Sequence, residues 1–398
     1  MPSDTLVPSP MNFNGDPMYV EIETALMSGT APYTPDEPNL SCYLEIWQDV
    51  AGTESKVLTT NLPYSRWNKK AQLDLSNILD LKARVPSRSH ITLLSTTIGS
   101  GPADGAAAKV FFKFGDMFGN PAVPPGTVVV SDKYVVVAGA SMYWYGFGTG
   151  AAYNTMLNAM YDINGKVIVK EVRKKQPEYL YFYSNSLSGS VSVKVNFNYT
   201  DGDNNEVTIS APGIVSGKVN YVAVGWNQLH LDNHVNGAKT LSFYSITITG
   251  IDDSWNYYRL HDHDQETDQY FLFDNGIGGC EVVRVSGYHE INFSGKKEVF
   301  VKARARGLDF QTGLSGTYNP QGSEEWKVNT GYITQEYARH LQQMCLGDCW
   351  YIDISRKSFI KCRVVNDSVK LFNYADDNNS IEFTVKFEER SSASTYKA

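Results

Sequence analysis

The sequence has few cysteines and no long apolar stretch. Five cysteines in 398 residues are odd in number and too few for a disulfide framework, so we expect free thiols. No run of about 18 apolar residues is present, and a membrane-spanning helix is therefore not expected. Hydrophobic residues make up 42% of the chain and charged residues 20%, which is typical of a soluble globular protein. This length favours two or three domains.

We also expect neither a leader segment nor a basic surface. The first 17 residues contain neither a basic region nor an apolar segment, so we expect no secretory signal and synthesis in a cytoplasm. The net charge is −8, and the densest basic run is only Arg173–Lys175. A nucleic-acid partner is not expected, because phosphate binding requires clustered positive charge.

Catalytic motifs are missing too. The sequence has no G-x-S-x-G, no phosphate-binding loop and no His-Glu-x-x-His. Residues 146–151 match the dinucleotide pattern G-x-G-x-x-A and precede a possible helix, with Glu171 further along, but hairpin-like sequence follows where a βαβ unit should continue into further alternating strands and helices. The turns at Asp201–Asn205 and Asp376–Ser380 begin like calcium loops and lack the required glycine. We therefore expect neither an enzyme nor a cofactor.

Alternating apolar and polar residues are abundant. Every second residue from Val191 to Tyr199 is apolar, and the same pattern runs from Ile381 to Phe387. This period of two is typical of half-buried antiparallel strands, and turn pairs such as Asn236-Gly237 separate further runs of the same kind. The pattern predicts a mainly β fold of tandem antiparallel β-sandwich domains, followed by a C-terminal α+β domain with one principal helix.

The principal helix is predicted over Thr334–Leu346. Thr334 can cap its first turn, Glu336 suits the helix dipole there, and Gly347 can end it. A second segment, Ala151–Tyr161, has two interpretations: a helix, or the first arm of a hairpin that turns at Asn164-Gly165.

Composition suggests three domains. A segment rich in Gly and Ala at 97–108 favours an N-terminal β-sandwich domain over residues 1–100. A β-sandwich region would follow over 101–258, and the charged stretch that begins at Glu171 is compatible with a further boundary near 170. The acidic segment 261–268 would then open the C-terminal domain, residues 259–398.

The densest group of chemically active side chains lies in residues 257–279. His261 and His263 are two positions apart, which on a strand places both rings on one face, and this makes them candidate metal ligands. Four acidic residues nearby could also suggest glycosidic cleavage, but neighbouring solvated carboxylates do not provide the raised pKa that this needs. We favour a hydrated domain junction followed by a hairpin that turns at Asn275-Gly276, with its glycines at positive φ.

Several short sequence segments occur in an order that is typical of one protein group. They are QPEYLYFYSN (176–185), VAVGWNQLHLD (222–232), FLFDNGIGGCEVVRVSG (271–287) and EEWKVNTGYITQEYARHLQQM (324–344), followed by CWYIDISRKSFIKCRVV and SIEFTVKFEER. This order resembles a group of structural proteins encoded in the tail modules of phages and prophages of Bacteroidetes. The resemblance implies a bacteriophage virion protein of the tail tip, baseplate or adaptor region, made in the bacterial host cytoplasm and assembled into the particle.

A tail protein would bind other virion proteins and copies of itself in a ring. Aromatic side chains are the candidate contacts, because buried aromatic area dominates many interfaces. The alternative function is a glycan-binding or glycan-cleaving module for host attachment, in which the same rings would stack on sugars. A third interpretation places each of them in an ordinary core. The candidates are Tyr143, Trp144, Tyr145, Trp255, Tyr257 and Tyr258.

Overall fold

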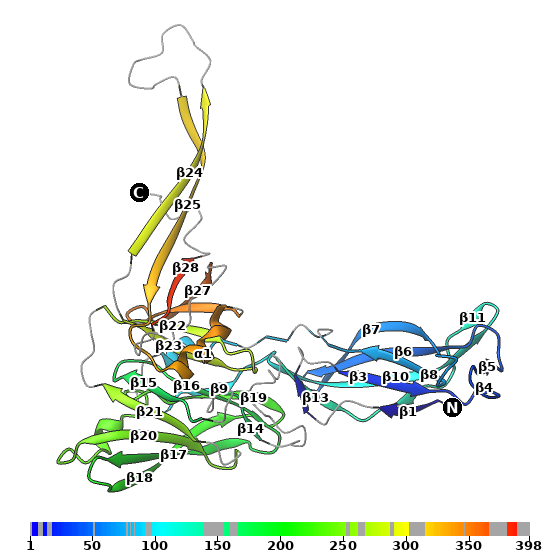
Figure 1. The fold of residues 1–398 in the computed structure, drawn as a ribbon, viewed down its shortest axis with the longest axis horizontal. Coiled ribbons are helices and arrows are strands. Elements are labelled where there is room, and N and C mark those ends of the chain that lie inside the picture. Colours follow the sequence, from blue (N-terminus) through cyan, green and yellow to red (C-terminus); the bar gives the residue numbers. More distant parts are fainter. Residues whose placement is uncertain are drawn as a thin grey trace.

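The computed structural model describes residues 2–6, 11–13, 18–50, 52–76, 79, 81–82, 84–91, 98–138, 154–158, 166–251, 255–261, 267–286, 290–301, 315–345, 347–365 and 380–387. Strands dominate these residues, and most of them pair in antiparallel sheets beside a single α-helix (Figure 1). The prediction of a mainly β fold with one principal helix is confirmed. None of the helices in this part of the chain is long and apolar enough to cross a membrane.

The N-terminal unit is a sandwich of two sheets. One sheet has the order β1 (Ser3–Leu6), β3 (Tyr19–Glu23) and β8 (Lys70–Asp74). The other has the order β2 (Met11–Phe13), β13 (Tyr134–Val137), β10 (Ala107–Gly119), β6 (Ser41–Val50) and β7 (Thr53–Pro63), with β11 (Ala122–Val123) and β12 (Val129–Val130) also paired to β10. A small hairpin of β4 (Met27–Ser28) and β5 (Thr34–Pro35) lies at the far end of the sandwich (Figure 1).

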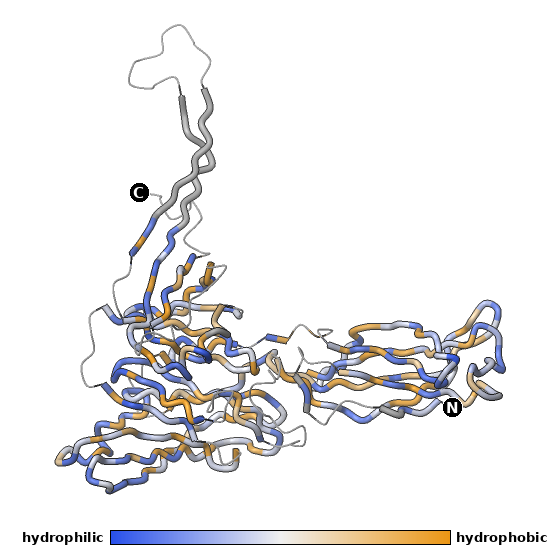
Figure 2. The backbone as a smooth tube through the Cα atoms, viewed as in Figure 1, coloured by the Kyte–Doolittle hydropathy of each residue, from blue (hydrophilic) through white to orange (hydrophobic). Residues whose placement is uncertain are grey.

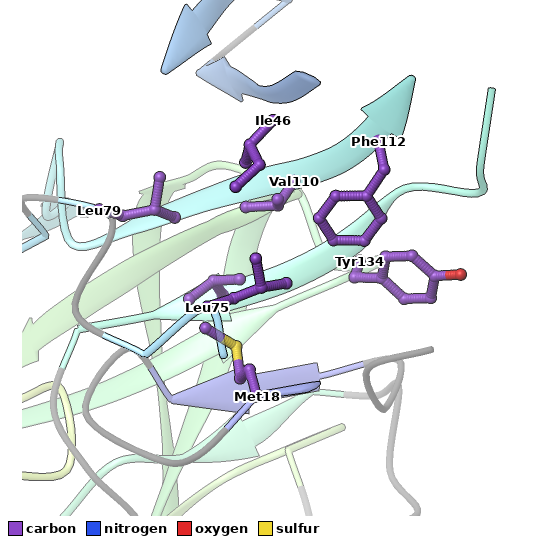
Figure 3. Close-up of a pocket in the computed structure, with 8 residues that line it drawn as sticks. Met18, Ile46, Leu75, Leu79, Val110, Phe112 and Tyr134 are labelled. Carbon is purple, nitrogen blue, oxygen red and sulfur yellow. The ribbon is translucent and has the colours of Figure 1, made fainter. Parts of the chain in front are cut away.

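Side chains from both sheets fill the space between them. In β6, Cys42, Leu44 and Ile46 are buried and the residues between them are more exposed, as the period of two requires. Figure 3 shows the residual cavity, where Met18 and Leu75 face residues of the opposite sheet. Its volume is about 10 Å³, which is at most one water molecule, so this core has no room for a ligand.

The N-terminal unit extends to Val137 and does not end near residue 100 as predicted. Its central strand, β10, lies after that boundary and pairs with β6 over nine residues. The Gly/Ala-rich segment resembles a loop in sequence because its side chains are small. In the structure, Ala103 and Ala106 are buried against tyrosines of the next unit, where small side chains allow close packing.

The middle unit is a second sandwich. Its smaller sheet has the order β14 (Thr155–Met156), β16 (Tyr179–Ser184), β19 (Lys218–Ala223) and β9 (Ser100–Pro102). Its larger sheet has the order β15 (Val169–Arg173), β21 (Asn256–His261), β20 (Leu241–Ile248), β17 (Gly189–Tyr199) and β18 (Asn204–Ile214). Two single-turn helices lie in connecting segments: η1 (Arg88–His90) between β8 and β9, and η2 (Leu231–Asn233) between β19 and β20.

The middle unit shows the predicted alternation of apolar and polar residues. It differs from two other predictions. In β17, Val191, Val193, Val195, Phe197 and Tyr199 are buried and alternate with half-exposed polar residues. Figure 2 shows the same alternation of apolar and polar residues along the strands of both sandwiches. No boundary lies near residue 170, because β14 pairs with β16 across it. The described part of the 151–161 segment, residues 154–158, contains strand β14 and no helix.

The C-terminal unit is one sheet covered by the helix. The sheet has the order β23 (Cys280–Val285), β22 (Gln269–Asp274), β26 (Cys349–Asp353), β27 (Ser358–Val364), β28 (Glu382–Phe387), β25 (Ser315–Asn329) and β24 (Glu290–Val301). The expected start of this unit at residue 259 falls inside β21, which belongs to the middle sheet, so the unit begins with β22.

Helix α1 (Gln335–His340) begins as predicted. The Thr334 hydroxyl accepts a hydrogen bond from the Tyr337 amide at 3.3 Å, which is the expected N-cap. The helix is shorter than predicted, because it continues as the tighter 3-10 helix η4 (Leu341–Cys345). The buried face of these two helices includes Tyr337, Leu341 and Met344, which pack on the C-terminal sheet core.

Strands β24 and β25 form a long hairpin that leaves the sheet. Their register runs from Glu290 opposite Lys327 to Val301 opposite Ser315. Strand β28 pairs with β25 only between residues 325 and 329, so the rest of the hairpin projects from the body as a two-stranded ribbon (Figure 1). We call residues 294–301 and 315–323 the arm.

Candidate functional site

The turn between β22 and β23 lies where the three units meet, and we call residues 275–279 the junction turn. The fully buried Asn275 organises it: its side-chain oxygen accepts hydrogen bonds from the amides of Ile277 at 3.1 Å and Gly279 at 3.0 Å. Its side-chain nitrogen donates to the Leu157 carbonyl at 2.6 Å and to Glu281 at 2.9 Å. A turn residue of the C-terminal unit is therefore hydrogen-bonded to the middle unit.

Two glycines allow the junction turn to approach its neighbours closely. Gly278 has φ of 95°, and a Cβ atom there would lie 2.6 Å from the Ala138 carbonyl oxygen, at the end of the N-terminal unit. A Cβ atom on Gly279 would lie 2.7 Å from the Leu157 carbonyl oxygen and 2.8 Å from the Tyr181 Cβ atom. Positive φ was predicted for the glycines of this turn, and Gly276 (71°) and Gly278 confirm it. The close contact at Gly279 was not predicted.

The connecting chain between the sandwiches is fixed at the same place. The carbonyl oxygen of Arg84 accepts a hydrogen bond from the Tyr181 hydroxyl at 2.6 Å, and the Cys280 thiol lies 3.8 Å from it. Burial raises the pKa of the Cys280 thiol well above its ordinary value, so it stays protonated and inert. All five cysteines are free thiols, as predicted.

Buried charges surround the junction turn. Lys170 Nζ on β15 lies 2.8 Å from Glu178 Oε2, and His340 Nε2 on α1 lies 2.8 Å from Glu281 Oε2 on β23. Asp268 contacts both Arg173, at 3.4 Å, and Arg284, at 3.2 Å. Of these pairs, Arg173 with Asp268 connects the middle unit to the C-terminal unit, whereas Lys170 with Glu178 lies within the middle unit and His340 with Glu281 within the C-terminal unit.

The two buried glutamates have opposite pKa shifts. Burial alone raises the pKa of Glu281, but the charge and hydrogen bond of His340, with further help from Lys170 and Asn275, lower it to about 2. Burial raises the pKa of Glu178, and the nearby Lys170 offsets this only in part. A carboxyl of raised pKa beside an ionised one is a pattern also found in acid–base catalysis.

The size of the cavity between these groups decides against catalysis there. Glu178, Glu281, His340 and Tyr257 line a cavity of about 20 Å³, which holds one water molecule and no sugar or other substrate. A cleft of about 360 Å³ does lie between the first two units, but its acids Asp49 and Asp104 already pair with lysines at 2.8 and 2.5 Å. We interpret the buried charges as structural.

The predicted aromatic contacts have different environments. Tyr258 is only 4% exposed and stacks on Tyr244 with 5.2 Å between ring centroids, so it belongs to the middle core. Trp255 and Tyr257 are half-buried, and an interface role for them stays a prediction. The three candidates at 143–145 lie outside the described residues.

The predicted metal ligands are not brought into a metal site in the described part of the chain. His261 Nε2 lies 3.2 Å from Glu171 Oε2 on the neighbouring strand β15, and its side chain is 39% exposed. His263 and the glycine motif at 146–151 lie outside the described residues. Among the described residues no three His, Cys, Asp or Glu side chains are grouped as a metal site would need.

Sequence reasoning missed Trp67, which at 72% exposure is the most exposed aromatic residue among those whose burial the structure describes. It lies in a tight loop between β7 and β8, where the Ser65 hydroxyl accepts a hydrogen bond from the Trp67 amide at 3.2 Å. The Ser65 and Lys70 backbones also bond across the loop at 2.8 Å. A signal was present in the sequence: Trp67 interrupts a run of polar residues, SRWNKK, in which no alternating pattern would bury it.

Three long strands stand at open ends of their sheets. Strand β7 ends the N-terminal sheet, β18 ends the middle sheet and β24 ends the C-terminal sheet. Each has 11 or 12 residues, and no other strand in the described part of the chain pairs with its outer side. Their free backbone groups are able to accept a further strand.

No protein-family model matches this sequence, and no curated protein is significantly similar to it. Inferences about function therefore depend on the structure and on the sequence features above.

We predict that Gly279→Ala destabilises the protein by about 2 kcal/mol, because the added methyl group overpacks the junction between Leu157 and Tyr181. Gly237→Ala is the matched control, since a Cβ there meets nothing within 4 Å. Denaturant unfolding of both variants measures the difference. Equal stability of the two variants would show that the junction turn does not require a close approach.

We predict that Glu281→Gln costs about 3 kcal/mol at pH 7, because it leaves the buried His340 without its charged partner. The folded pKa of Glu281, about 2, is below the ordinary value of about 4.3, so its contribution is present above that value and is lost as pH falls towards 2. The difference between wild type and variant should therefore shrink between pH 5 and pH 2.

Thermal unfolding across this pH range tests the prediction. The control is Glu325→Gln, whose partner Lys386 lies 2.9 Å away in a pair that is about one-third exposed, and which should cost less than about 1 kcal/mol. A loss at Glu281 no larger than at Glu325 would contradict a stabilising role for the buried pair.

Proposed function

We propose that this protein is a structural subunit of a bacteriophage virion, in the tail or baseplate region, that assembles through its open sheet edges. The observation that carries the proposal is the set of three long edge strands, β7, β18 and β24. The resemblance in sequence to tail-module proteins supports it independently.

Long open edges are unusual in proteins that act alone. Proteins normally cover or shorten such edges, because free N–H and C=O groups pair with other chains. Here the edges carry a few charges at exposed positions, Glu54 and Lys56 on β7 and Glu206 on β18, and each pairs with a side chain of its own unit. Such charges disfavour pairing with unrelated strands and permit pairing with a partner of complementary charge.

The junction supports an assembly role as well. Because the junction turn contacts the N-terminal and middle units through Ala138 and Leu157, the units hold their edges in fixed relative directions. Binding then does not have to order flexible domains, which lowers the entropic cost of assembly.

Mass spectrometry of purified virions tests the proposal. We expect this protein at a copy number that is a multiple of three or six, as a symmetric ring requires. Hydrogen exchange of the particle against the free chain should show protection within 53–63, 204–214 or 290–301, and no change in the central strands β10 and β17. Absence of the protein from the virion would refute the proposal.

The exposed Trp67 favours the alternative function, binding of a host glycan. An exposed indole face, on a loop whose backbone is hydrogen-bonded to the Ser65 hydroxyl, can stack on a sugar ring. If this alternative is correct, the isolated chain should bind a glycan array with about micromolar affinity, and Trp67→Ala should weaken binding at least about tenfold. Tyr332→Ala is the control, because Tyr332 is 71% exposed on a different unit. No binding by wild type, or equal loss in both variants, would exclude glycan recognition by Trp67.

A further inference from the structure

We propose that Cys349 and Cys362 form an oxidisable pair, which closes to a cross-strand disulfide when hydrogen peroxide reacts with the reduced protein. The two residues lie opposite each other in the antiparallel pairing of β26 with β27. Both are free thiols in this structure. The formation of the disulfide does not depend on the proposed function.

The backbone already places the two cysteines at the spacing of a disulfide. Directly opposed residues in antiparallel strands have Cα atoms about 4.5 to 5.5 Å apart, and disulfides connect Cα atoms about 4.4 to 6.8 Å apart. The register runs without a bulge from Cys349 opposite Cys362 to Asp353 opposite Ser358. The S–S bond therefore needs no large movement of either strand.

The two side chains also contact each other. Opposed residues project from the same face of a sheet, and both cysteines belong to the core that packs against α1, at 0% and 1% exposure. A hydrogen bond with the Cys362 side chain, together with burial, raises the pKa of the Cys349 thiol well above its ordinary value. Among the described strand pairings, no other places two cysteines opposite each other.

Burial makes the reaction slow without preventing it. The thiolate is the nucleophile, so a buried and protonated thiol reacts only when the strands around it open locally. Cys280 is equally buried, but it lies opposite Asp274 and remains a single thiol. What distinguishes Cys349 is the second sulfur beside it, because this partner converts a reversible oxidation into a stable bond.

The reaction consumes one molecule of hydrogen peroxide. The thiolate of one cysteine attacks a peroxide oxygen and breaks the O–O bond, which leaves a sulfenic acid and, after protonation of the leaving hydroxide, one water molecule. The second cysteine attacks the sulfenic sulfur, forms the S–S bond and displaces the hydroxyl group, which leaves with a proton as a second water molecule. In total the two thiols lose two electrons and two protons, and these reduce the peroxide.

The disulfide would join two halves of the C-terminal sheet. Cys349 lies opposite Phe273 of β22, the strand that leads into the junction turn, and Cys362 lies opposite Phe387 of β28. A bond between them stabilises the sheet, chiefly because it restricts the unfolded chain. In the proposed virion protein, the reducing host cytoplasm would preserve the thiols and release into an oxidising medium would close the bond. This consequence, unlike the disulfide itself, rests on the proposed function.

Peptide mass spectrometry of the oxidised full chain tests the inference. The chain is incubated with hydrogen peroxide just below its melting temperature, where local opening is frequent, and is then alkylated and digested with trypsin without reduction. Trypsin cleaves after Arg356 and Lys361, so the disulfide should join segment 340–356 to the dipeptide 362–363. Cys345, which lies in the same longer peptide, should be alkylated.

Thermal unfolding provides a second measurement. Oxidation should raise the melting temperature of wild type by at least about 3 °C. Dithiothreitol should reverse the rise, which separates it from methionine oxidation. Cys362→Ala should abolish the rise, whereas Cys42→Ala, which removes a buried thiol of the N-terminal unit, should retain it. Each protein is compared with its own reduced form, so any stability lost through the substitution cancels.

Three results would overturn the inference: a wild-type chain that keeps all five thiols after oxidation, a disulfide through Cys345 instead, or a linked protein that melts no higher than the reduced one. These results are independent of the virion measurement. A protein present in the virion that forms no disulfide retains the proposed function and loses this site, whereas a disulfide in a protein absent from the virion does the reverse.

Discussion

The architecture depends on one close approach of backbone to backbone, at the junction turn. Gly278 and Gly279 leave no space for a side chain between the C-terminal unit and the other two, and Asn275 bonds to the Leu157 carbonyl beside them. The sheets on both sides of the turn are large, so a small shift at the turn would move the distant ends of all three units. Nearby polar contacts are arranged around this fixed point.

The buried charges limit how the units can pack. Apolar surfaces alone would tolerate sliding, because the hydrophobic effect has no direction. The pair of Arg173 with Asp268 tolerates it poorly, since sliding would separate the buried Asp268 carboxylate of the C-terminal unit from Arg173 of the middle unit. Such pairs contribute little net free energy when they are formed, and a large penalty when one partner is missing.

Local features of this fold could be predicted from the sequence, and contacts between distant segments could not. The Thr334 cap, the alternation of β17 and the glycine turn at Asn275-Gly276 each depend on a few consecutive residues. The extension of the N-terminal unit to Val137 depends on the pairing of β10 with β6, and the burial of Tyr258 depends on Tyr244. The alternating pattern predicts a strand but does not predict which other strand it pairs with. A change in composition does not mark a domain boundary where small residues are needed for close packing at an interface. The sequence of the arm, similarly, does not differ from that of an ordinary β-hairpin, so its projection from the body could not be predicted.

The pairing of β9 with β19 and of β15 with β21 has a consequence for the order of folding. Synthesis from the N-terminus completes the first sandwich at Val137, but β9 waits for residues 218–223 and β15 waits for residues 256–261. The junction turn emerges later still, and only then can the units take their final angles. A chain that lacks the junction turn thus lacks the contacts of Asn275 and Gly278 that fix the angles between its units, and only the completed chain holds them in place.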